Sequence, residues 1–75
     1  MPRVEAEKTN VQKAREYAKA NGLSYDAAYW LMEAAIRADG RQPRLARDGV
    51  GIPAATDLSA SDAAALSAAK AAIGL

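Results

Sequence analysis

The sequence predicts an all-α fold of three helices, and three observations carry this prediction. Alanine occupies 20 of the 75 positions and has the highest helix propensity of any residue. Three segments each begin after a Thr or Ser and end at or just before a glycine, which is the usual marking of helix boundaries. Apolar residues recur inside these segments at spacings of three and four. The length allows a single domain spanning 1–75.

The first helix is predicted over about 10–21. Thr9 and Gln12 have the spacing of a capping box, in which each side chain bonds the backbone of the other residue. Asn21-Gly22 supplies a left-handed stop. We expect residues 1–8 to be frayed or disordered, with a ragged extension of this helix toward residue 3 as the alternative.

The second helix is predicted over about 25–39. Ser24 is the expected N-cap, and Asp26 places a negative charge in the first turn, where the helix dipole favours it. The segment has no interior Gly or Pro and stops at Gly40.

The third helix is predicted over about 60–73. Ser59 and Asp62 have capping-box spacing, and Gly74 ends the segment. Leu66 and Ile73 are its only large apolar residues. Since alanine buries little surface, we expect this helix to form readily but to dock weakly.

A long loop, 40–57, joins the second and third helices. Its length exceeds what is common for a structureless connection in a compact domain, so it is either functional or disordered. A small hairpin closed by Asp48-Gly49 is a weaker alternative, since Gly51 and Pro53 disfavour it.

The apolar surface of the second helix extends further around its circumference than the first and third helices can cover. We place its residues around the helix axis at 100° per residue. One narrow stripe holds Asp26, Trp30, Glu33 and Arg37, and the opposite side holds Ala28, Leu31 and Ala35. The flank next to the opposite side holds Tyr25, Tyr29, Met32 and Ile36. A helix with one face in solvent needs an apolar stripe of only about 100° around its circumference. Self-association, a partner chain or a central place among three helices would cover the excess.

Trp30 has two interpretations. It would tuck under a neighbouring helix or the long loop, or it would serve as an exposed anchor for a partner, because Trp, Tyr and Met are enriched at interface centres. On the second interpretation the partner-binding residues are Trp30, Tyr25, Tyr29 and Met32.

Four arginines form the main charge cluster, namely Arg37, Arg41, Arg44 and Arg47. They would supply a charged rim or an anion-binding site through bidentate forks. The alternative is a solvated loop in which Arg37 pairs with Glu33 at i,i+4. The first two helices superficially resemble a helix-turn-helix, but Asp26 at the start of the second would repel phosphate.

Composition excludes several classes of function. The chain has no Cys and no His, which removes disulfides, Cys/His zinc sites, thiol nucleophiles and imidazole bases. No close carboxylate pair lies in an apolar segment and no phosphate-binding loop is present, so we expect no enzyme activity, catalytic residue, metal or cofactor. A net charge of +1 argues against duplex DNA as the partner. Without a membrane span or signal peptide, the expected location is cytoplasmic.

Residues 14–28, Ala-Arg-Glu-Tyr-Ala-Lys-Ala-Asn-Gly-Leu-Ser-Tyr-Asp-Ala-Ala, resemble a segment near the C-terminus of some tailed-phage head maturation proteases and their scaffolding products. In that segment a helix with an Ala-Arg-x-Tyr-like stretch is followed by a Gly-hydrophobic-Ser step and an Ala-rich helix. The resemblance covers a fifth of the chain and implies a capsid-assembly or scaffold-like binding segment.

The sequence therefore predicts a small helical protein–protein interaction module that self-associates or binds another chain. The alternative is a small nucleic-acid-binding factor that uses the arginines of 37–47.

Overall fold

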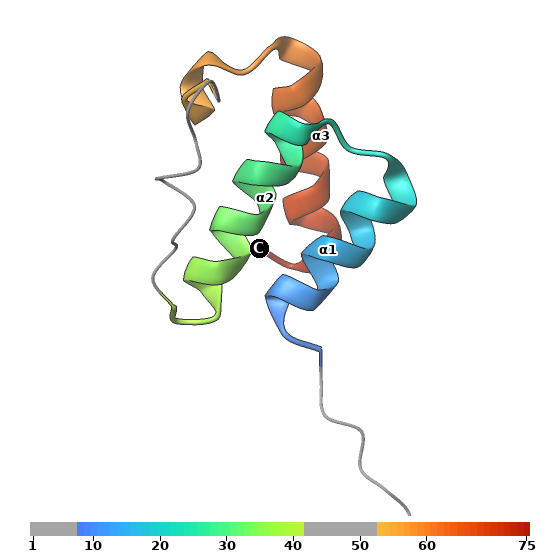
Figure 1. Cartoon of the computed structure of the whole chain (residues 1–75), viewed down its shortest axis with the longest axis vertical. Coiled ribbons are helices and arrows are strands. Elements are labelled where there is room, and N and C mark those ends of the chain that lie inside the picture. Colours follow the sequence, from blue (N-terminus) through green and yellow to red (C-terminus); the bar gives the residue numbers. More distant parts are fainter. Residues whose placement is uncertain (1–7, 42–52) are drawn as a thin grey trace, which may run out of the picture.

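The computed structural model describes residues 8–41 and 53–75, and within these ranges the fold is all-α. Helix α1 spans Asn10–Asn21, helix α2 spans Tyr25–Ala38 and helix α3 spans Ala60–Ile73, and a 3-10 turn, η2, lies at Ala55–Asp57 before α3. Each of the three α-helices packs against both of the others, and Figure 1 shows them as a small bundle. The predicted fold class is confirmed.

Local capping determines where α1 begins and ends, as the sequence predicted. The Gln12 amide donates to Thr9 Oγ1 at 3.2 Å, and the Thr9 amide donates to Gln12 Oε1 at 2.9 Å, which completes the capping box. Gly22 takes the left-handed conformation, with φ of 59°. Residues 8 and 9 are not helical, so α1 does not extend to them.

Helix α2 begins as predicted but ends one residue earlier. Ser24 Oγ accepts a hydrogen bond from the Ala27 amide at 3.2 Å. Asp39, which we placed in the helix, is instead its C-cap, with backbone angles φ −80° and ψ 4°. Gly40 follows with a positive φ of 78°.

Helix α3 has the predicted bounds but only half of the predicted capping box. Ser59 Oγ accepts from the Asp62 amide at 3.2 Å. The Asp62 carboxylate does not return to Ser59 and instead accepts from Ser24 Oγ at 2.7 Å. The 3-10 turn η2 lies inside the segment that we assigned to a loop.

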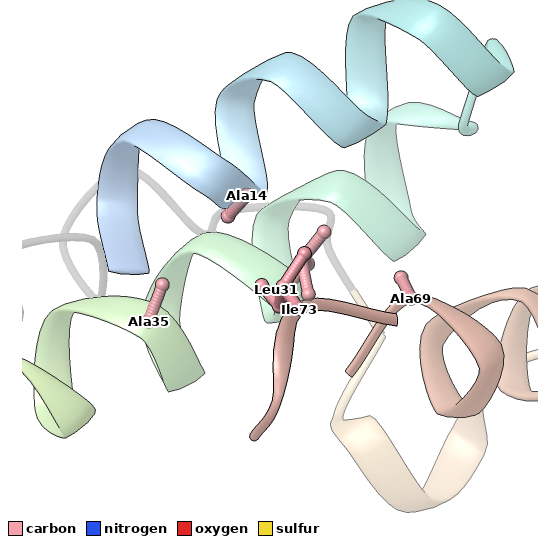
Figure 2. Close-up of a cluster of buried hydrophobic side chains, with 5 residues drawn as sticks. All are labelled: Ala14, Leu31, Ala35, Ala69 and Ile73. Carbon is pink, nitrogen blue, oxygen red and sulfur yellow. The ribbon is translucent and has the colours of Figure 1, made fainter. Parts of the chain in front are cut away.

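The core of the bundle is built mainly from alanine. The buried hydrophobic residues of the described part are Ala14, Ala27, Leu31, Ala35, Ala69 and Ile73. Figure 2 shows five of them meeting where the three helices face one another. Leu31 and Ala35 belong to the side of α2 that helical phase placed opposite the polar stripe. Ala27 is buried one turn before Leu31, whereas Ala28, which the same phase placed beside Leu31 and Ala35, is only half-buried.

Helix α3 takes a full part in this core despite its alanine content. Ala69 and Ile73 are buried, and Leu66 and Leu75 pack against the cluster. The predictions for residues 1–7 and for a hairpin at Asp48-Gly49 lie outside the described residues.

Candidate functional site

The Trp30 side chain joins α2 to the segment that precedes η2. Its indole Nε1 donates to the Pro53 carbonyl oxygen at 3.0 Å. The Tyr29 and Trp30 rings meet edge to face, with centroids 5.1 Å apart and an interplanar angle of 81°. The ring of Trp30 is half-buried. The polar edge of the indole is thus hydrogen-bonded within the molecule, while part of the ring surface stays accessible to solvent.

Tyr25 is the most accessible aromatic residue of the bundle. It is the first residue of α2 and is 69% exposed, the one large hydrophobic residue within 8–41 and 53–75 that is mostly in solvent. Tyr25 and Tyr29 are four residues apart and so lie on the same side of the helix. We call Tyr25, Tyr29 and Trp30 the α2 aromatic surface.

Met32, the fourth predicted contact residue, lies differently. It is half-buried and packs against the hydrophobic core cluster, so much of its apolar side chain serves the interior. The sequence placed Met32 on the same flank as Tyr25 and Tyr29, but helical phase alone does not show how far a neighbouring helix extends around that flank.

The charged groups beside the aromatic residues form local pairs. Arg37 Nε donates to Glu33 Oε1 one turn earlier in α2, which is the i,i+4 pair that we gave as the alternative for Arg37. Arg41 is exposed, and its positive charge acts on Asp39. Arg44 and Arg47 lie outside the described residues, so the structure does not bring the four arginines together as a cluster.

Asp39 connects the end of α2 to the start of α1. One carboxylate oxygen accepts from the backbone amide and the side-chain amide of Asn10, both at 3.0 Å, and the other accepts from the Val11 amide at 3.1 Å. Burial acts to raise the pKa of Asp39, but these hydrogen bonds and the charge of Arg41 outweigh it and hold the pKa below its ordinary value. Sequence reasoning missed this contact because its residues are 28 and 29 positions apart.

A shallow groove of about 370 Å³, lined by both apolar and polar residues, runs along one side of α3. We call it the α3 groove, and its lining residues are Ala55, Leu58, Ala63, Leu66, Ser67, Lys70, Ala71 and Leu75. The sequence did not indicate the groove, because the groove depends on how the segment before α3 lies beside that helix.

The described residues show no centre for metal chemistry and no helix suited to a bilayer. Within 8–41 and 53–75, no three Asp or Glu side chains lie close enough together to hold a metal ion. None of the helices in these ranges combines the length and the apolar character needed to cross a membrane. The chain matches no known family model, and comparison with curated proteins and with solved structures gives no match.

Proposed function

We propose that this protein is a small helical protein–protein interaction module whose main contact surface is the α2 aromatic surface. The single observation that supports this most is the exposure of Tyr25, at 69%, beside a half-buried Tyr29–Trp30 pair. A tyrosine left in solvent on the first turn of a helix contributes nothing to the core of its own bundle. It does offer a large apolar area to another chain.

The arrangement of this surface favours specific binding of a partner over non-specific apolar association. Trp30 is held by the Pro53 carbonyl and by the edge of Tyr29, so these rings lose little conformational freedom when a partner docks. Asp26 and the Glu33–Arg37 pair lie on the same stripe of α2 as Trp30, on either side of it along the helix. An aromatic centre with a charged rim is the usual composition of a protein interface.

The resemblance of residues 14–28 to phage assembly proteins supports a finer version of the proposal. The stretch includes α1 from residue 14 onward, the Gly22 turn and Tyr25. On this version the partner is another chain of an assembling structure, a further copy of this protein included. Of the arginines on which the nucleic-acid alternative depends, Arg37 is paired with Glu33 and Arg41 lies beside Asp39, and these contacts favour the protein-binding proposal.

The test compares three immobilised proteins as baits in lysate of the source organism: the wild type, Tyr25→Ser and the control Ala64→Ser, which changes an exposed position of α3 outside both 14–28 and the lining of the α3 groove. We expect proteins that the wild type and Ala64→Ser retain to bind Tyr25→Ser at least ~10-fold more weakly, the effect of losing about 1.4 kcal/mol. Circular dichroism verifies that each bait is folded. Identical capture by all three baits would overturn the proposal.

A further inference from the structure

The α3 groove is a surface of mixed apolar and polar lining that the rest of the described chain leaves uncovered. Three leucines line it, Leu58 near one end, Leu66 in the middle and Leu75 at the other end. Leu66 and Leu75 also pack against the core cluster, so each divides its surface between the core and the groove. The groove is therefore continuous with the interior, and a docked chain would extend the same apolar core.

The solvent-exposed side of α3 carries no charge. Its exposed positions are all Ala or Ser, namely Ala60, Ser61, Ala63, Ala64, Ser67, Ala68, Ala71 and Ala72. The two charged residues of the helix, Asp62 and Lys70, are half-buried. Small residues let a second helix approach closely, and Lys70 is the one charged residue of α3 that lines the groove, so its ammonium group needs an acidic partner when a second chain docks.

The charges around α3 select the direction of an approaching chain. Lys70 is the one cation in 53–75, and the two acids, Asp57 and Asp62, lie toward the other end of that segment. An antiparallel copy of α3 would place its Lys70 near the acids of the first copy. A parallel copy would place Lys70 against Lys70. Antiparallel helix dipoles add to the same preference.

The order of the lining residues fits a two-fold axis. Let the axis pass midway between Leu66 and Ser67. Leu58 of one copy then lies opposite Leu75 of the other, since the two are equally far along the chain from that midpoint. Ala63 lies opposite Lys70 in the same register, which brings the ammonium group next to Asp62. A surface whose two halves match in this way is self-complementary, as a symmetric dimer requires.

We propose that the α3 groove binds α3 of a second copy of this chain, antiparallel and about a two-fold axis near Leu66 and Ser67. The proposal deepens the proposed function, on which it rests, because it names one partner and gives it a surface separate from the α2 aromatic surface.

The first experiment places a bulky cation at the axis. Ser67→Arg sets two arginines against each other in the dimer, whereas Ala68→Arg puts the same side chain at the next position, which is also exposed but does not line the groove. Arginine keeps the helix stable at both positions. By sedimentation velocity over a dilution series, we expect a wild-type monomer–dimer equilibrium, unchanged in Ala68→Arg and weakened at least ~10-fold in Ser67→Arg.

The second experiment tests the direction of the helices. Lys70→Glu puts a third acid beside Asp57 and Asp62 of the other copy in the antiparallel dimer, so we expect it to weaken dimerisation, and more so at low salt. In a parallel pair the same change would replace one like-charge contact by another and leave the dimer unweakened, which would overturn the antiparallel arrangement.

The outcomes separate this proposal from the proposed function. A wild type that stays monomeric throughout, or equal dimerisation of Ser67→Arg and Ala68→Arg, overturns the groove proposal even where capture still depends on Tyr25. A dimer lost in Tyr25→Ser but kept in Ser67→Arg overturns it as well and leaves the α2 aromatic surface as the contact. A Ser67-sensitive dimer with no dependence of capture on Tyr25 supports the groove and overturns the role of Tyr25.

Discussion

At the scale of single residues, close approach contributes more to this fold than large buried side chains do. Four of the six buried hydrophobic residues in the described part are alanine, and Leu31 is the one large side chain that is fully buried there. A methyl group buries little surface, but it lets helix backbones pack tightly. The stability that large side chains supply is therefore concentrated at Leu31 and, to a lesser extent, at Ile73.

Leu31→Ala is expected to lower the free energy of unfolding by about 2–5 kcal/mol, because a cavity would open where three helices meet. This is a large part of the stability expected for so small a protein. Urea denaturation followed by circular dichroism measures the loss. Met32→Ala, at the next position but only half-buried, is the control and should lose less. Equal losses would contradict the central position of Leu31.

Gly22 is the residue whose backbone the fold constrains most clearly. Its φ of 59° is left-handed, and an added Cβ would meet nothing within 4 Å. The cost of Gly22→Ala is therefore conformational, about 1–2 kcal/mol of unfolding free energy. Gly22→Asn should cost less, because asparagine tolerates this conformation better. Thermal unfolding of both variants measures the difference, and a more stable Gly22→Ala would contradict it.

At the scale of elements, helix bounds could be predicted from sequence because capping acts over three or four residues. Thr9, Ser24 and Ser59 all cap the helices they precede, and Gly22 ends the first. Contacts between elements could not be predicted in this way. Asp39 shows why: its position just after α2 looked like part of that helix, and only the packing of α1 beside α2 brings its carboxylate to the Asn10 amide.

Asp39 acts as a second N-cap for α1, supplied by another element. A carboxylate that accepts from the first amides of a helix also interacts favourably with the helix dipole. Since its pKa is lowered by folding, Asp39 contributes stability that is present above its ordinary pKa of 3.8 and is lost as the pH falls through the lower folded value.

Asp39→Asn is therefore expected to destabilise the protein at neutral pH, with a deficit that shrinks as the pH falls below about 4, where the wild-type carboxyl becomes protonated. Unfolding curves for both proteins across pH measure this. Asn10→Ala removes only the side-chain donor and leaves two backbone amides on the carboxylate, so its deficit should be smaller. A deficit of Asp39→Asn that stays constant down to low pH would show that the charge of Asp39 does not matter.

At the scale of the whole molecule, α2 connects every other described element. Its N-cap Ser24 bonds Asp62 in α3, its Trp30 bonds Pro53 ahead of η2, and Asp39 at its C-terminal end bonds the first residues of α1. The sequence indicated a central α2 through its wide apolar arc. One interpretation of Trp30 placed it under the loop 40–57, to which Pro53 belongs, but the sequence did not indicate the contacts of Ser24 and Asp39, since each joins residues far apart in the chain.

The candidate surfaces differ in how far sequence reasoning reached them. The aromatic residues of α2 stood out by type and spacing, and Tyr25 is exposed as an interface residue needs to be. The α3 groove did not stand out, because an alanine-rich helix looks featureless until the leucines on either side of it are placed in space. Whether a side chain is accessible depends on its neighbours in the fold. This explains why Met32 is half-buried against the core whereas Tyr25 is exposed to solvent.

A core of methyl groups also restricts how this protein can change. Ala14, Ala35 and Ala69 are buried in the same cluster between the helices, and Figure 2 shows Leu31 and Ile73 lying between Ala35 and Ala69. A larger side chain at any of these three positions would have to push whole helices apart. In a saturation mutagenesis library selected for folding, we therefore expect alanine to be retained almost without exception at these three positions, whereas the positions next to them should accept many residues. Alanine, the commonest residue in the sequence, would then be the residue that tolerates substitution least at these positions.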